Sequence, residues 1–182
     1  MDSPRRLGVA VVTLAVSAGC AAHGAAGKPI PHFYRVTHEL YRGGQPTDEG
    51  LRRLKELGVK TVVDLREEDP ALIAHEQRLV ESLGMHWVHL PMRSSLRPSQ
   101  SQVDTFLKLM NNRYNQPVFI HCREGEDRTG ALVALYRVAQ QGWVPKAAYS
   151  EARSLGLGWN PMMRRVILHQ SGPSAVRVAG SN

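Results

Sequence analysis

Short apolar runs alternate with segments of helical periodicity through the middle of this chain. The runs at 59–65, 85–90 and 117–121 have the length and apolar character of buried strands. In other segments the apolar residues recur every three or four positions, namely at 47–57, 69–83, 99–110, 128–141, 145–154 and 161–169. Alternation of strand and helix favours a parallel sheet with helices on its faces. We therefore predict an α/β fold with a mostly parallel central sheet flanked by helices.

Capping residues and glycines mark the ends of these predicted helices. Thr47 is suited to cap the first helix, and Gly58 ends it. Ser99 and Gln102 form a capping box for the helix at 99–110. The strand at 117–121 leads through a short loop directly into the helix at 128–141. Open α/β sheets bind their ligands at such a junction between strand and helix.

The charge of the chain points to an anionic partner. The 182 residues carry a formal net charge of +7, and the pI is near 9.8. A phosphorylated substrate, a membrane surface and nucleic acid are all anionic. Only 6% of the residues are aromatic, and the sequence has no long run of Lys or Arg with interleaved aromatics. We therefore expect no nucleic-acid partner.

The first twenty residues have the order of an export signal. The segment at 1–6 is short and basic, the segment at 7–18 is apolar, and small residues follow. The apolar run is shorter than the roughly 20 residues that span a bilayer. Ser17-Ala18-Gly19-Cys20 resembles the lipobox at which bacterial lipoproteins are cut and acylated, although Ser17 replaces the preferred Leu or Val. We expect an exported lipoprotein anchored to a membrane through Cys20. A cleaved signal that leaves a soluble periplasmic or secreted protein is the alternative.

This interpretation divides the chain into four segments. Residues 1–20 form the signal, and residues 21–32 form a flexible tether of Gly, Ala, Lys and Pro without periodicity. One domain is expected over 33–172, and a disordered tail over 173–182. The only cysteines are Cys20 and Cys122. With Cys20 lipidated, Cys122 has no partner for a disulfide, and a lone thiol in an oxidising compartment favours a reactive role.

The loop after the strand at 117–121 combines three features that suit phosphate chemistry. Backbone N–H groups at a helix N-terminus bind phosphate oxygens. Gly125 lets the loop curl back where a side chain would clash. Arg128 offers a planar fork to two phosphate oxygens, and together with the helix dipole it favours the thiolate form of Cys122. Attack of that thiolate on phosphorus would give a phosphocysteine, which water must then hydrolyse.

The string HCREGEDRTG at 121–130 resembles the signature loop of the protein-tyrosine phosphatase superfamily. It is most similar to the loop of bacterial dual-specificity-like phosphatases, and the similarity extends to the segments at 41–46 and 63–66 and covers about 33–142. The resemblance implies hydrolysis of phosphomonoesters, with protein tyrosine or dual-specificity substrates favoured. It implies neither a cofactor nor a metal. The expected partner is a phosphorylated protein or a small phosphorylated anion.

The same resemblance assigns roles to individual residues. Cys122 is the nucleophile, and Arg128 clamps the transition state. Thr129 helps the thiolate leave in the second step, and His121 supports the ionisation of Cys122. The residues expected to surround the phosphate are Arg123, Glu124, Gly125, Glu126, Thr129 and Gly130.

The general acid departs from the family pattern. Related enzymes carry an Asp on a mobile loop after the preceding strand, but residues 90–98 contain no acidic residue. Asp104 lies in a predicted helix and is expected on the surface. Some relatives with an Asp immediately before the Arg use that Asp as the acid, so we favour Asp127. Glu124 and Glu126 are the alternatives.

Three other functions compete with a protein phosphatase. The basic charge and the loop with its arginine also suit an inositol phosphate or phosphoinositide phosphatase. The absence of an acid from 90–98 suits a catalytically weak module that only binds phosphate. A rhodanese-like sulfur transferase fits less well, because rhodanese loops lack Arg at the position of Arg128.

Two arginines near the predicted loop and two histidines complete the candidate residues. For Arg42 and Arg66 we predict structural ion pairs with Asp64 or Glu67 rather than substrate contacts. His86 and His89 are three positions apart, and a strand would turn them to opposite faces. We therefore predict no metal site.

Overall fold

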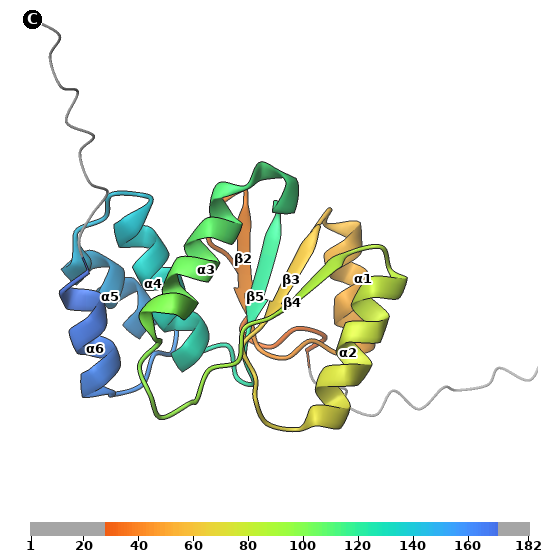
Figure 1. Cartoon of the computed structure of the whole chain (residues 1–182), viewed down its shortest axis with the longest axis horizontal. Coiled ribbons are helices and arrows are strands. Elements are labelled where there is room, and N and C mark those ends of the chain that lie inside the picture. The colour runs from red at the N-terminus through yellow and green to blue at the C-terminus, as the bar shows by residue number, and fades with distance from the viewer. Residues whose placement is uncertain (1–27, 171–182) are drawn as a thin grey trace, which may run out of the picture.

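The computed structural model describes residues 28–170, and these form one α/β domain (Figure 1). Cys20 and the predicted signal and tail lie outside the described residues, so lipidation stays a prediction. The elements in chain order are β1 (Tyr34–Arg35), β2 (Leu40–Gly43), α1 (Asp48–Glu56), β3 (Thr61–Asp64), α2 (Pro70–Ser82), β4 (His86–His89), α3 (Gln100–Asn111), a 3₁₀ turn (Arg113–Asn115), β5 (Val118–His121), α4 (Asp127–Ala139), α5 (Pro145–Ser154) and α6 (Pro161–Leu168). Within 28–170, no helix is both long and apolar enough to cross a membrane.

The five strands form one sheet in the order β1-β2-β5-β3-β4. β2, β5, β3 and β4 run parallel, and only the two-residue β1 is antiparallel to its neighbour. β5 is the middle strand of the sheet, with β2 and β3 on either side. The predicted α/β fold with a mostly parallel sheet is thus confirmed.

Helices cover both faces of the sheet because neighbouring strand residues point in opposite directions. Val62 and Phe119 pack with α1 and α2, whereas Val63 and Ile120 pack with α3 and α4. In Figure 1, α1 and α2 lie on one side of the strands and α3 to α6 on the other. β3 and β5 are buried along their whole length, and their middle residues are apolar, as expected for parallel strands covered on both faces.

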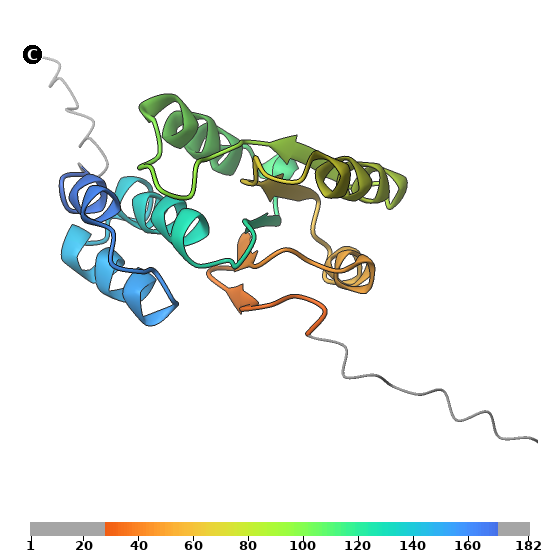
Figure 2. The same cartoon turned by 90° about the horizontal axis from the view of Figure 1, so that it is seen from below.

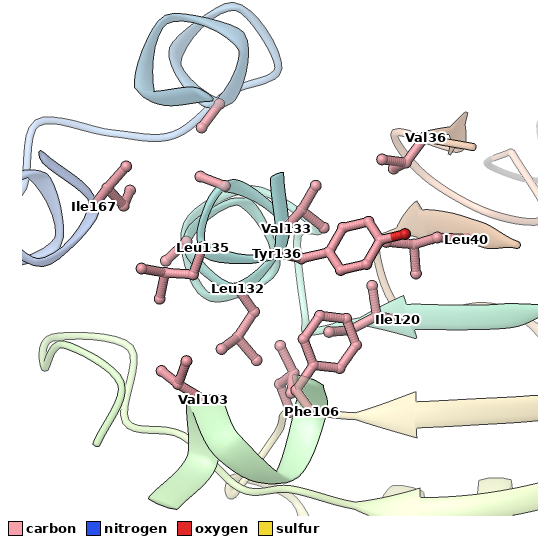
Figure 3. Close-up of a cluster of buried hydrophobic side chains, with 14 of the residues drawn as sticks. Val36, Leu40, Val103, Phe106, Ile120, Leu132, Val133, Leu135, Tyr136 and Ile167 are labelled. Carbon is pink, nitrogen blue, oxygen red and sulfur yellow. The ribbon is translucent and has the colours of Figure 1, made fainter. Parts of the chain in front are cut away.

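α4 is the most deeply buried helix, since α5 and α6 pack on its outer side (Figure 2). Every residue from 128 to 138 is buried. Its inner side meets the sheet and α3, where Leu132 lies near Phe106 and Ile120 (Figure 3). The rings of Phe106 and Tyr136 meet edge to face, with their centroids 6.4 Å apart. A helix packed on all sides holds its N-terminus firmly, and that N-terminus adjoins the candidate loop.

Residues 28–32, which were predicted to belong to a flexible tether, pack on the domain, and the rest of the predicted tether lies outside the described residues. Ile30 is buried between Gly43 and α1. The carbonyl of Pro29 accepts a hydrogen bond from the Thr47 amide, and the carbonyl of Pro31 accepts one from the Gly44 amide. The proline and glycine content of the segment indicated a linker, but prolines also suit an extended strap whose carbonyls are bonded to the domain.

Candidate active site

The candidate loop, residues 122–126, leaves the carboxyl end of the middle strand. β5 ends at His121 and α4 begins at Asp127. The last residues of the two neighbouring strands, Gly43 and Asp64, pair in register with His121. The loop is therefore flanked by the segments that follow β2 and β3, as expected for a ligand site of an open parallel sheet.

Gly125 makes the tight turn of this loop possible. Its φ is +81°, a value that favours glycine, and a Cβ on it would lie 2.3 Å from the carbonyl carbon of Gly43. The Gln45 amide donates to the Arg123 carbonyl at 2.9 Å, and Nη2 of the buried Arg42 donates to the Gly125 carbonyl at 2.6 Å. The end of β2 thus holds the loop from behind.

Cys122 lies at the base of the loop and is 3% exposed. It is the only cysteine of residues 28–170 and is not in a disulfide. Its Sγ accepts a hydrogen bond from the Gly125 amide at 3.2 Å. An amide that points at the sulfur at the start of a helix stabilises a thiolate. In the described structure, the buried hydroxyl of Thr129, near the start of α4, has no hydrogen-bond partner.

The guanidinium of Arg128 is buried and is bound by Glu68, from the loop between β3 and α2. Nη1 donates to Oε2 of Glu68 at 2.9 Å, and Nη2 donates to Oε1 at 2.6 Å. Nη1 also donates to the carbonyls of Leu65 and Met92. The hydrogen bond from Arg128 lowers the pKa of Glu68 to about 2. Burial alone would lower the pKa of Arg128, but its bonds with Glu68 and its electrostatic interaction with Cys122 raise it.

Beneath the loop lies a buried cluster of charged groups from three elements. Arg66 donates to Asp64 and to Glu76, each at 2.8 Å through Nη2. Nε2 of His121 lies 2.9 Å from Oε1 of Glu76, and its Nδ1 lies 3.2 Å from the Cys122 carbonyl. These bonds fix the imidazole ring and the first carbonyl of the loop together.

Arg66 determines the charge balance of this cluster. Burial alone would raise the pKa of Asp64, but the hydrogen bonds from Arg66 and the charge of His121 lower it. Asp64, Glu76 and His121 are close enough to hold a metal ion. Arg66 already provides a positive charge bonded to both carboxylates, so the donor set does not require one. The predicted ion pair of Arg66 with Asp64 is present. Arg42 differs from the prediction, because it binds loop carbonyls instead of an acid.

The three acidic residues between Cys122 and Arg128 have different surroundings. Oδ1 of Asp127 accepts a hydrogen bond from the Gly158 amide at 2.7 Å, in the segment between α5 and α6. Glu126 is half-exposed beside His32, with its Oε1 3.5 Å from Nδ1. Glu124 is exposed beside Arg123. The acid role predicted for Asp127 stays a prediction, and the geometry adds a bond to Gly158.

Comparison with known proteins identifies the family. A family model described as "DSP-PTPase phosphatase fused to NAD+ Kinase" matches residues 32–162, well over half of the chain. The chain belongs to this DSP-PTPase family. The dual specificity protein phosphatase TpbA of Pseudomonas aeruginosa is 32% identical over 138 residues, which are 75% of this chain and 60% of TpbA. Its crystal structure superimposes with a TM-score of 0.62 and 28% identity, covering 80% of this chain and 86% of that one.

Two further similar proteins are an inositol diphosphatase and a PP-IP phosphatase. The inositol diphosphatase DSP3 of Arabidopsis thaliana is 26% identical over 136 residues, 72% of this chain and 66% of the relative. The catalytic core of the PP-IP phosphatase SIW14 of S. cerevisiae has a TM-score of 0.70 and 23% identity, and the match covers 79% of this chain and 88% of that one. The SIW14 likeness shows the same fold.

Sequence reasoning missed Glu68 and Glu76 of this DSP-PTPase domain. Their partners Arg128 and His121 are 60 and 45 positions away in the sequence, so no local spacing relates them. Two weak signals were present. Glu68 follows a predicted strand beside the candidate loop, and Glu76 falls on the apolar face of its helix, near Ile73 and Val80. An acid on a buried helical face indicates a buried cationic or polar partner.

Proposed function

We propose that this protein is a cysteine-dependent phosphatase that hydrolyses phosphomonoesters through a phosphocysteine intermediate. The observation that carries the proposal is the arrangement around Cys122. Its sulfur accepts a hydrogen bond from the Gly125 amide. The buried guanidinium of Arg128 is close enough to interact electrostatically with Cys122. A thiol nucleophile that accepts a backbone amide hydrogen bond and lies near a planar cationic fork suits attack on a phosphoryl group.

The reaction has two steps that balance in atoms and charge. In the first, the Cys122 thiolate attacks phosphorus, the bond to the ester oxygen breaks, and that oxygen leaves as an alcohol after taking a proton. Asp127 is the proposed donor of this proton. In the second, water attacks the phosphocysteine and gives a proton back to Asp127, the bond between sulfur and phosphorus breaks, Cys122 leaves as a thiolate assisted by the Thr129 hydroxyl, and inorganic phosphate is released. Arg128 and the loop amides bind the phosphoryl oxygens in both steps.

Phosphotyrosine and other phosphoprotein esters are the favoured substrates. The relative TpbA is named a dual specificity protein phosphatase, and it is 32% identical to this chain. Cys122 is buried at the base of the loop, which suits a phosphate carried on a long side chain such as tyrosine. An aryl oxygen is also a good leaving group and needs little help from an acid.

An inositol phosphate phosphatase is the second candidate, and exposed arginines near the loop favour it. Arg123 lies in the loop itself, and its side chain is 69% exposed. Arg93 follows β4, and its side chain is 70% exposed, with its Nε 3.8 Å from Glu67. Two exposed cations on long side chains can bind additional phosphates of a polyanion. The relative DSP3 is named an inositol diphosphatase.

Replacement of the nucleophile tests the proposal. Cys122→Ser should abolish turnover while inorganic phosphate still binds, because a serine hydroxyl is not ionised at neutral pH but the loop amides remain. The assay compares phosphotyrosine peptides, phosphoserine peptides and inositol polyphosphates, with phosphate binding measured by calorimetry on the same samples. Asp104→Asn, at an exposed position on α3, serves as the matched control and should retain full activity. Turnover above a few per cent of wild type in the serine variant would contradict the assignment of Cys122.

A further inference from the structure

Glu68 binds the end of the Arg128 guanidinium that carries Nη1 and Nη2. The carboxylate bridges the two terminal nitrogens, with Oε2 2.9 Å from Nη1 and Oε1 2.6 Å from Nη2. The bonds to the Leu65 and Met92 carbonyls also start from Nη1. The hydrogen bonds to these three residues therefore leave Nε and the second proton of Nη2 for another acceptor. Those two N–H groups form a planar fork that fits two oxygens of a phosphoryl group.

The carboxylate of Glu68 is itself held in place. The Glu67 amide donates to Oε2 of Glu68 at 3.0 Å. Glu68 is ionised throughout the range in which the protein would act, because Arg128 lowers its pKa to about 2. Its side chain is 39% exposed and lines an open pocket of about 230 Å³ together with Gln45, Arg66, Asp69, Leu72 and Arg123. Glu68 therefore lies at the edge of the site, next to the loop, rather than under it.

We propose that Glu68 is a positioning residue that orients Arg128 for the phosphoryl group before substrate binds. This proposal rests on the proposed phosphatase function. An arginine side chain has several rotatable bonds, and ordering it on substrate binding would cost conformational entropy. The bidentate pair with Glu68 and the two carbonyl bonds fix that side chain in advance. The fork formed by Nε and Nη2 is then already ordered when the phosphate binds.

Two other roles for Glu68 make opposite predictions. If the carboxylate occupied the phosphate position, it would compete with substrate, and its removal would strengthen phosphate binding. If Glu68 donated the proton to the leaving group, its removal would eliminate the basic limb of the pH–rate profile. A positioning residue that is ionised at every working pH changes neither the shape of that profile nor its dependence on the leaving group.

The test compares Glu68→Gln with the matched control Glu67→Gln. Glu67 is the neighbouring acid, and its side chain contacts only the exposed Arg93, at 3.8 Å, among the ion pairs of residues 28–170. Glu68→Gln should lower kcat/KM by about 10- to 100-fold, since small displacements of a positioned group can cost about 10² in rate. It should also weaken binding of inorganic phosphate and leave the shape of the pH–rate profile unchanged. Glu67→Gln should stay within about twofold of wild type.

A double-mutant cycle with Arg128→Lys isolates the pair. Lysine has no fork for Glu68 to orient, so Glu68→Gln should have no further effect on phosphate binding in that background. Tighter phosphate binding in Glu68→Gln, loss of the basic limb, additivity in the cycle, or wild-type behaviour would each overturn the proposal. Phosphate binding by calorimetry needs no turnover. If wild-type protein binds phosphate but hydrolyses no ester, the proposed function fails, and the effect of Glu68 on binding is still measured.

Discussion

Asp127 and Arg128 are adjacent in the sequence, but their side chains bind different parts of the molecule. Arg128 interacts with Cys122 and is hydrogen-bonded to Glu68, whereas Oδ1 of Asp127 accepts a hydrogen bond from the Gly158 amide. A Cβ on Gly158 would lie 3.1 Å from the same oxygen, so the segment after α5 approaches closely because it has glycine there. Asp127 thus has two candidate roles. It can protonate the leaving oxygen, or it can hold the start of α4 against that segment.

Leaving groups of different basicity separate these roles. If Asp127 is the acid, Asp127→Asn should slow hydrolysis of alkyl phosphates by about 10²–10⁴-fold and of activated aryl phosphates only slightly. The basic limb of the pH–rate profile should also flatten. Asp104→Asn, at an exposed position on α3 away from the loop, is the matched control. The measurement is kcat/KM across a series of leaving groups. A uniform loss with weaker phosphate binding would instead assign Asp127 a structural role.

Among the residues of the candidate site, some could be predicted from local sequence and others could not. Cys122, Gly125 and Arg128 all lie within residues 122–128, so local spacing was enough to predict that they are neighbours. Glu68 and Glu76 come to the loop from other elements. The pairing of β3 with β5 and the packing of α2 bring them there, and no local spacing in the sequence reveals these long-range contacts.

The loop and the end of β2 form one unit at the scale of elements. Gly125 lies against the Gly43 and Gly44 backbone, the Arg123 carbonyl accepts the Gln45 amide, and Arg42 donates to the Gly125 carbonyl. β2 was not predicted, because its sequence Leu-Tyr-Arg-Gly lacks an apolar run. A buried arginine is tolerated inside this strand because its Nη2 binds the loop. The helices, in contrast, begin and end near the predicted caps, as in the capping box of Ser99 and Gln102.

Two glycines with the same backbone conformation allow the contact with β2 to be tested. Gly125 has φ +81° and Gly58 has φ +79°, but a Cβ added at Gly125 would meet backbone atoms, whereas one added at Gly58 would have nothing within 4 Å. Alanine at either position adds about 1–2 kcal/mol of conformational strain. Gly125→Ala must also displace the loop from β2. It should lower kcat/KM by about 10² or more, because the phosphate cradle moves.

Gly58→Ala is the control, since it carries the strain without the clash. It should lower the melting temperature modestly and leave kcat/KM unchanged. Gly125→Ala should lower both the melting temperature and kcat/KM. Thermal unfolding and steady-state kinetics on the two variants provide the comparison. Equal activity in both variants would show that close packing of Gly125 on Gly43 is not required for the site.

At the scale of the whole molecule, one buried cluster connects β3, α2 and β5 beneath the loop. Asp64 ends β3, Glu76 lies on α2, His121 ends β5, and Arg66 bonds to both acids. The alternation of strands and helices was sufficient to predict the layers around this cluster, because apolar burial determines them. The cluster itself was predicted only for Arg66 and Asp64, which are two residues apart. The partners from α2 and β5 meet them only when the sheet and its helices assemble.

The cluster should make stability depend on pH in a direction that follows from Asp64. Burial alone would raise the pKa of Asp64, but the hydrogen bonds from Arg66 hold it below the ordinary value of 3.8 in the folded protein. The stabilising contribution is therefore complete above about pH 4 and is lost as the pH falls through the folded pKa. Asp64→Asn removes one partner of a buried ion pair and should lower the free energy of unfolding by about 3–5 kcal/mol at neutral pH. That difference from wild type should shrink on acidification below about pH 4.

An exposed acid provides the control for this prediction. Asp48 pairs with His75 at 2.8 Å, but both side chains are half-exposed, and surface pairs contribute about 0–1 kcal/mol. Asp48→Asn should therefore change the free energy of unfolding little at any pH. Denaturant titrations of the three proteins between about pH 3 and pH 7 measure both differences. If Asp64→Asn costs no more than Asp48→Asn, or if its cost grows on acidification, the buried cluster does not hold the sheet, α2 and the loop together. Asp64 would then be tolerated in the core without stabilising the site above it.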